Sequence, residues 1–78
     1  MPPRTITIRV PADLGLAIAE IRATTGITQQ AAADAAGIDR TYLSRIENGL
    51  SDLLLERTIR VLRRLGADIV VTLPEQGR

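Results

Sequence analysis

The sequence of 78 residues has no cysteine, no histidine, no tryptophan and no phenylalanine, and Tyr42 is its single aromatic residue. Without cysteine, disulfide bonds and thiolate metal sites are excluded, and a reducing cytoplasm is the expected location. Without histidine, the usual zinc ligand and the usual general base are missing, and no phosphate-binding glycine loop is present. We therefore expect no enzymatic activity, no metal and no cofactor.

Long apolar runs are also missing. No stretch of 18 apolar residues could span a membrane, and the N-terminal residues lack the apolar run of a signal peptide, so we expect no membrane association. The net charge is only +1, yet all ten cationic side chains are arginine. Arginine suits bidentate recognition of phosphate and guanine, although GC-rich codon usage explains the same bias. A chain this short buries only about 60% of its unfolded surface, so oligomerisation is the expected aid to a small core.

Periodicity and capping signals predict a mostly α-helical single domain, residues 1–78, with a strand at each end. Residues 5–10 alternate between polar and β-branched side chains, which predicts a half-buried strand that Pro11 ends. Leu14, Ile18 and Ile21 recur at helical spacing, and further helices are expected to be capped by Thr28, Asp39, and Ser51 or Asp52. The predicted helices are 12–25, 29–36, 40–48 and one from about 52 to 65, within a helical core of 12–66, and the final strand is 68–73.

The second and third predicted helices have the spacing of a helix-turn-helix. Ala33 is small enough for a close helix crossing, and Gly37 allows the left-handed turn that follows. Leu43 and Ile46 then lie on the buried face of the third helix. Residues 40, 41, 44, 45 and 48 fall on its other side.

From Gly26 to Gly66 the sequence resembles the Xre/lambda-repressor-like helix-turn-helix family. The matching residues are Thr28-Gln29, Ala33, Ala-Gly-Ile at 36–38, Tyr-Leu-Ser-Arg-Ile-Glu-Asn-Gly at 42–49, and Val-Leu-Arg-Arg-Leu-Gly at 61–66. The chain departs from the family at Leu53-Leu54, where members usually carry proline followed by serine or threonine. That departure leaves the start of the fourth helix uncertain by a residue or two, and it leaves the cluster Leu53-Leu54-Leu55 unexplained.

The resemblance implies that the third helix enters the major groove of a double-stranded, palindromic operator, which would make the protein nucleoid-associated. Its implied base-contacting residues are Arg40, Thr41, Ser44 and Arg45, and its implied phosphate-contacting residues are Thr28, Gln29 and Asn48. The side-chain chemistry agrees, because arginine pairs with guanine and threonine offers a hydroxyl and a methyl group.

Simpler interpretations stay open for several of these side chains. Arg45 could instead pair with Glu47 or Asp52, and Gln29 could serve only as a local cap. Tyr42 is expected to pack rather than to contact DNA. The arginines of the fourth helix are expected on its outer face, where they favour solubility over phosphate contact; they are Arg57, Arg60, Arg63 and Arg64.

Two other functional classes are compatible with parts of the sequence. The N-terminal residues resemble the start of a ribbon-helix-helix repressor, in which Thr5, Thr7 and Arg9 would read bases, but such folds end after two helices. We expect the N-terminal strand to pair with residues 68–73 instead. A protein-interaction module that uses the leucine cluster or the strands is the other alternative.

The ending Leu-Arg-Arg-Leu-Gly-Ala-Asp-Ile-Val-Val-Thr-Leu at 62–73 resembles that of HipB-type antitoxins. This resemblance implies a homodimer that represses its own operon and binds a toxin, such as a HipA-like kinase; a stand-alone regulator without a toxin is the alternative. A strand that is apolar on both faces, beside a helix with two apolar stripes, calls for a twofold partner, so we expect the terminal strands to pair in a dimer. The residues expected at the dimer interface are Leu54, Val61, Leu65, Ile69, Val70 and Val71.

Overall fold

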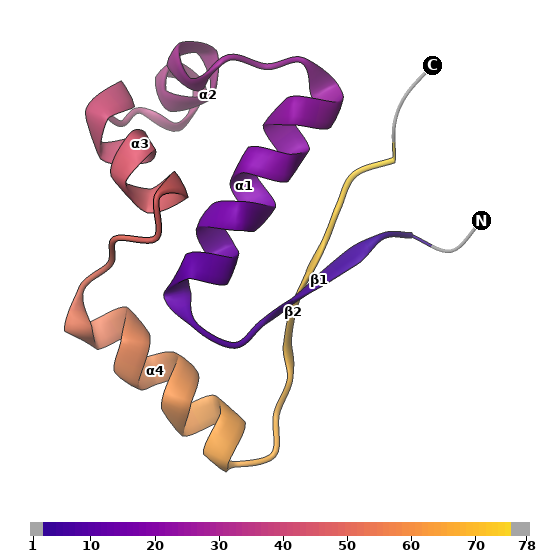
Figure 1. Cartoon of the computed structure of the whole chain (residues 1–78), viewed down its shortest axis with the longest axis vertical. Coiled ribbons are helices and arrows are strands. Elements are labelled where there is room, and N and C mark those ends of the chain that lie inside the picture. Colours follow the sequence, from indigo (N-terminus) through magenta and orange to yellow (C-terminus); the bar gives the residue numbers. More distant parts are fainter. Residues whose placement is uncertain (1–2, 76–78) are drawn as a thin grey trace.

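The computed structural model describes residues 3–75 and has the expected order of strand, four helices and strand (Figure 1). The elements are β1 (Thr5–Ile8), α1 (Pro11–Thr25), α2 (Gln29–Ala36), α3 (Arg40–Glu47), α4 (Leu53–Arg64) and β2 (Ile69–Thr72). The mostly α-helical fold class is confirmed. The observed elements differ from the predicted ones by one or two residues at several ends.

The end of β1 shows why one boundary was wrong. The carboxylate of Asp13 accepts hydrogen bonds from the backbone N–H groups of Arg9 (2.8 Å) and Val10 (3.2 Å). The backbone N–H groups of these two residues are therefore used at the start of α1, and the strand does not extend to Val10. The same bonds lower the pKa of Asp13, with the Arg9 bond as the largest cause.

The capping predictions were right at two helices and wrong at one. The Thr28 hydroxyl accepts from the N–H of Ala31, and the Asp52 carboxylate accepts from the N–H of Leu55, each at 3.0 Å. Asp39 occupies the expected position before α3, but its side chain makes no capping bond. α3 therefore begins without a hydrogen bond from the side chain of its N-cap residue.

The two strands pair with each other as an antiparallel ribbon within one chain. Ile8 lies opposite Ile69 and Ile6 opposite Val71, so one face of the ribbon carries aliphatic side chains toward the helices. The ribbon continues beyond β2, where the N–H of Leu73 donates to the carbonyl of Arg4 at 2.9 Å. Val70, expected to be covered, points to the open face and is about half exposed.

The core is small and centres on α1, which lies between the ribbon and α3 (Figure 1). Gly15 is buried where α1 crosses α3: a Cβ atom there would meet the carbonyl oxygen of Ile46 and lie 3.0 Å from the Cα of Glu47. Glycine therefore allows the two helix backbones to touch. The fully buried apolar residues are Ile8, Ala17, Ala33, Leu43, Ile59 and Leu73.

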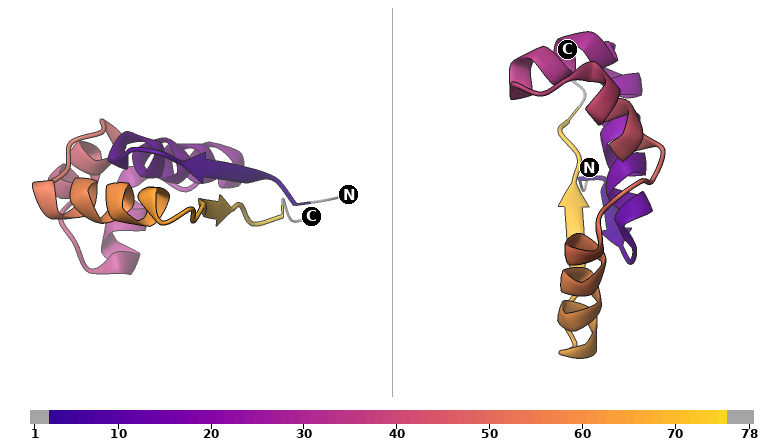
Figure 2. Two further views of the ribbon diagram at one scale, coloured as in Figure 1. Left: turned by 90° about the horizontal axis from the view of Figure 1, so that it is seen from below. Right: turned by 90° about the vertical axis from the view of Figure 1, so that its left-hand side faces the viewer.

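α4 extends away from this core, and the molecule is thin, with extents of 38 × 35 × 17 Å (Figures 1 and 2). Ile59 is its one buried side chain among the described residues. Leu55 and Leu62, which share the apolar stripe of Ile59, stay more than one-third exposed. The cluster Leu53-Leu54-Leu55 is at the surface.

Candidate nucleic-acid interface

α2 and α3 cross at the residues that the sequence indicated. Ala33 is completely buried at the crossing. Gly37 has φ +72°, a left-handed conformation, and its N–H donates to the carbonyl of Asp34 at 3.2 Å. The N–H of Ile38 donates to the carbonyl of Ala33 at 3.0 Å, which closes the turn before α3 begins. The predicted turn geometry is therefore confirmed.

α3 separates an inner apolar face from an outer polar one. Leu43 is buried and Ile46 is partly buried, as the spacing predicted. Arg40, Thr41 and Arg45 are exposed on the outer side. The helix thus presents two guanidinium groups and a hydroxyl group to solvent from a backbone that is fixed on its inner side.

An ion pair anchors the C-terminal end of α3 to α1. The Nε and Nη2 atoms of Arg22 donate to the two carboxylate oxygens of Glu47, each at 2.7 Å, in a bidentate arrangement. The Nη1 atom of Arg22 also donates to the carbonyl of Ile27 at 3.1 Å, and Gln29 Nε2 donates to Glu47 Oε1 at 3.1 Å. The Glu47 carboxylate, 8% exposed, therefore ties α1 and the start of α2 to α3, and Arg22 also holds the α1–α2 loop.

These contacts shift the protonation equilibria of both partners. The hydrogen bonds from Arg22 lower the pKa of Glu47; the bond from Gln29 adds to the effect, while burial opposes it. The hydrogen bond to Glu47 raises the pKa of Arg22. Both groups therefore stay charged at neutral pH, and the pair holds α3 in place.

Two of the simpler interpretations of single residues are wrong. Arg45 makes no ion pair with Glu47, which is bonded to Arg22, nor with Asp52 or any other carboxylate in residues 3–75. Gln29 is no local cap, because its amide is bonded to Glu47. One of its two amide hydrogens is therefore used inside the protein.

The other expected site residues lie around α3 and the start of α2. Thr28 is exposed and uses its hydroxyl oxygen to cap α2. Ser44 is partly buried, and the Asn48 amide nitrogen lies 3.5 Å from its hydroxyl oxygen. Tyr42, expected to pack, has 58% of its surface exposed. The structure thus brings the base-contacting and phosphate-contacting candidates to neighbouring positions on α2 and α3.

Two contacts that position α3 were not predicted from the sequence. Arg22 is separated from Glu47 by 25 residues, and no local pattern links them. Gly15 did carry a signal for the other contact, since a glycine inside an amphipathic helix often marks a close backbone approach. The position of α3 in the chain was therefore predicted, but the contacts with α1 that hold it were not.

A comparison with protein families supplies the context for this geometry. A family model described as helix-turn-helix matches residues 18–71, well over half of the chain. The chain belongs to the Xre-like helix-turn-helix family. Neither the comparison with curated proteins nor that with solved structures found a match.

As a member of the helix-turn-helix family, the protein is a DNA-binding regulator of transcription. The match runs from the middle of α1 to β2 and so includes α2, the turn and α3. The ribbon-helix-helix alternative does not fit the structure, because β1 is paired with β2 and four helices follow it. Within the described residues, no helix is long and apolar enough to cross a membrane.

Proposed function

We propose that the protein is a homodimeric, sequence-specific repressor that reads a palindromic operator with the outer face of α3. The observation that carries the proposal is the contrast between the two faces of this helix. Glu47 is clamped by Arg22, whereas Arg40 and Arg45 extend into solvent without a carboxylate partner in residues 3–75. A guanidinium without an internal partner is available for the O6 and N7 atoms of guanine.

In this proposal the residues divide into two groups. Arg40, Thr41, Ser44 and Arg45 contact base edges. Thr28, Gln29 and Asn48 contact phosphates, for which the exposed start of α2 supplies N–H groups and a positive helix end. The second amide hydrogen of Gln29 stays available for a phosphate oxygen.

The test is selection of binding sites from a library of random DNA duplexes. We expect the protein to enrich a palindrome whose half-sites are centred about 34 Å, or one helical turn, apart. Arg40→Ala should relax the preference at one position in each half-site. Enrichment of no common sequence would contradict specific reading by α3.

Dimerisation is supported by the apolar surface of α4. Leu54 is 74% and Leu65 is 77% exposed, and Val61 lies exposed on the same side of the helix. Val70 adds a further exposed aliphatic side chain on the ribbon, next to the partly buried Ile69 and Val71. A second copy of the chain would remove this surface from water, which stabilises the dimer by about 25 cal/mol per Å² of apolar area buried.

Analytical ultracentrifugation tests the dimer. The double variant Leu54→Ser, Leu65→Ser should sediment as a folded monomer and bind the selected palindrome much more weakly than the parent. The control is Arg57→Ser, which changes an exposed residue of the same helix and should remain dimeric. A dimeric double variant would exclude this face of α4 as the interface.

We further propose that the repressor is the antitoxin of a toxin–antitoxin pair and represses its own operon. This proposal is supported by the strand that follows α4, since β2 and the buried Leu73 give the chain the short C-terminal ribbon expected of that subgroup. Co-expression with the product of the adjacent gene should yield a complex, with a HipA-like kinase as the expected toxin class. A neighbour that neither binds nor inhibits growth would leave a stand-alone regulator.

A further inference from the structure

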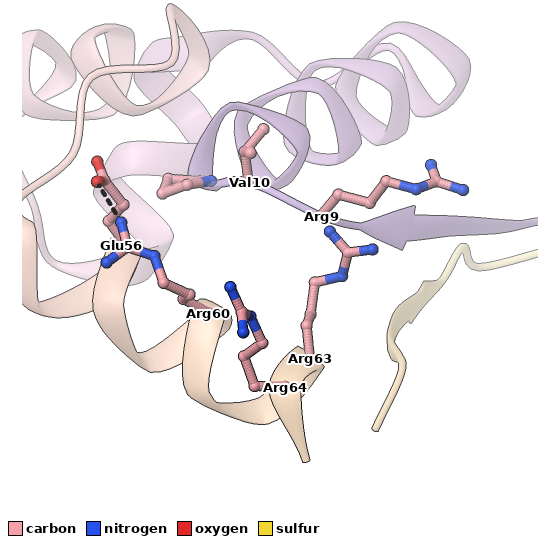
Figure 3. Close-up of a pocket in the computed structure, with 7 residues that line it drawn as sticks. Arg9, Val10, Glu56, Arg60, Arg63 and Arg64 are labelled. Atoms are coloured by element: carbon pink, nitrogen blue, oxygen red, sulfur yellow. Dashed lines mark hydrogen bonds and ion pairs between the residues drawn. The ribbon is translucent and has the colours of Figure 1, made fainter. Parts of the chain in front are cut away.

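A second arginine cluster lies outside the DNA-reading helices. Arg9, which follows β1, and three arginines of α4 line a groove with a volume of about 480 Å³ (Figure 3). The α4 arginines were predicted to favour solubility, and no local sequence pattern connects Arg9 with residues more than 50 positions away. The arginine groove is lined by Arg9, Val10, Pro11, Glu56, Arg60, Arg63 and Arg64.

The positive charge of the arginine groove is only partly balanced. Glu56 pairs with Arg60 at 3.2 Å, within one helix and at an exposed position. Asp13, the other acid beside the groove, is near enough to Arg9 and Arg63 for their charges to act on it, but its carboxylate accepts from two backbone N–H groups. No ion pair forms to Arg9, Arg63 or Arg64 in the described part of the chain. Four arginines and one glutamate therefore line the groove, and an anionic ligand would find favourable charges there.

The floor of the groove indicates the kind of anion. Val10 is half exposed and Pro11 lies beside it, so the arginines surround an apolar patch. The only apolar groups of a DNA backbone are the C–H groups of deoxyribose between its phosphates, whereas a peptide with alternating acidic and aliphatic side chains matches both features. The groove also lies at the end of the molecule opposite to α2 and the start of α3 (Figures 1 and 3).

We propose that the arginine groove is a docking site for an acidic peptide segment of a partner protein. Carboxylates of the segment form bidentate pairs with Arg9 and Arg63, and an aliphatic side chain between them covers Val10. Arg60 and Arg64 hold further carboxylates along α4. This site is separate from the DNA-reading face, so the repressor can hold a partner and its operator together.

Fluorescence anisotropy with a labelled twelve-residue peptide of alternating glutamate and leucine tests the proposal on the full chain. We expect saturable binding that falls at least tenfold in the double variant Arg9→Gln, Arg63→Gln. The matched control is Arg57→Gln, an arginine of the same helix that does not line the groove and whose loss should change binding less than twofold. A glutamine–leucine version of the peptide should not bind.

Other outcomes would overturn the proposal. An equal loss in the Arg57→Gln variant would mean that net charge alone attracts the peptide. Absence of saturable peptide binding to the folded parent, checked by circular dichroism, would exclude the site. If the double variant instead lost binding to a random DNA duplex while its peptide binding was unchanged, the groove would be a nucleic-acid contact.

Discussion

The bundle of α1, α2 and α3 and the helix α4 are held in very different ways. In the bundle, backbones touch at Gly15 and a bidentate ion pair closes the far end of α3. α4 is attached to the rest through Ile59, and most of its aliphatic side chains face solvent. The bundle therefore has the rigidity that a base-reading helix needs, whereas α4 is left for contacts with other molecules.

Gly15→Ala should have the largest effect, because it breaks the bundle at its tightest contact. The new Cβ would meet the backbone at Ile46 and Glu47, which no side-chain rotation can relieve. Overpacking costs about 1–3 kcal/mol, and we expect the upper end or more here. Alanine has a helix propensity about 1 kcal/mol more favourable than glycine, so the free energy of unfolding measured in urea should fall by about 2 kcal/mol.

The control for this variant is Leu16→Ala, which changes the next residue of α1, 60% exposed, and should cost under about 0.5 kcal/mol. Equal stability of Gly15→Ala and the parent would show that α1 and α3 are not in backbone contact.

Glu47→Gln should remove the ion pair with Arg22, which is the second contact that holds α3 against α1. Loss of a charge-assisted pair should cost about 1–2 kcal/mol at pH 7. The pKa of Glu47 is lowered in the folded protein, so its contribution is fully present above the ordinary value of 4.5 and is lost as the pH falls through the lowered folded pKa. The stability difference between parent and variant should therefore vanish in acid.

Thermal unfolding from pH 2 to pH 7 measures this difference. Asp13 also has a lowered pKa, but it is present in both proteins and cancels in the comparison. A difference that stays constant over the whole range would contradict the ion-pair account.

Hydrogen exchange should show the smallest and most local effect. In the Leu54→Ser, Leu65→Ser variant, amides of α4 should exchange faster than in the parent, which we propose to be a dimer, because few internal contacts hold the helix. Amides of α1 and α3 should keep their protection. Equal loss of protection in all helices would mean that the bundle is not stable without α4.

The part of the fold that follows from local patterns was predictable. Alternation predicted β1, and a run of β-branched residues that is apolar on both faces predicted β2. The Thr28 and Asp52 caps predicted the starts of α2 and α4, and Gly37 predicted the turn. The outer residues of α3 followed from helical spacing and the family resemblance. What could not be predicted depends on distant partners, namely the pairing of Arg22 with Glu47 and the grouping of Arg9 with the α4 arginines. The prediction that the Asp39 side chain caps α3 was wrong, because a residue in the cap position need not use its side chain.

The central claim is that a clamped inner face leaves the outer face of α3 free to read DNA, and Arg45→Ala tests it most directly. The measurement is the ratio of affinities for the selected palindrome and for a random duplex at one fixed salt concentration. We expect the substitution to reduce discrimination by about 1–3 kcal/mol at one base position, while Arg57→Ala leaves the ratio unchanged. An unchanged ratio in a folded Arg45→Ala variant would contradict base reading by this residue.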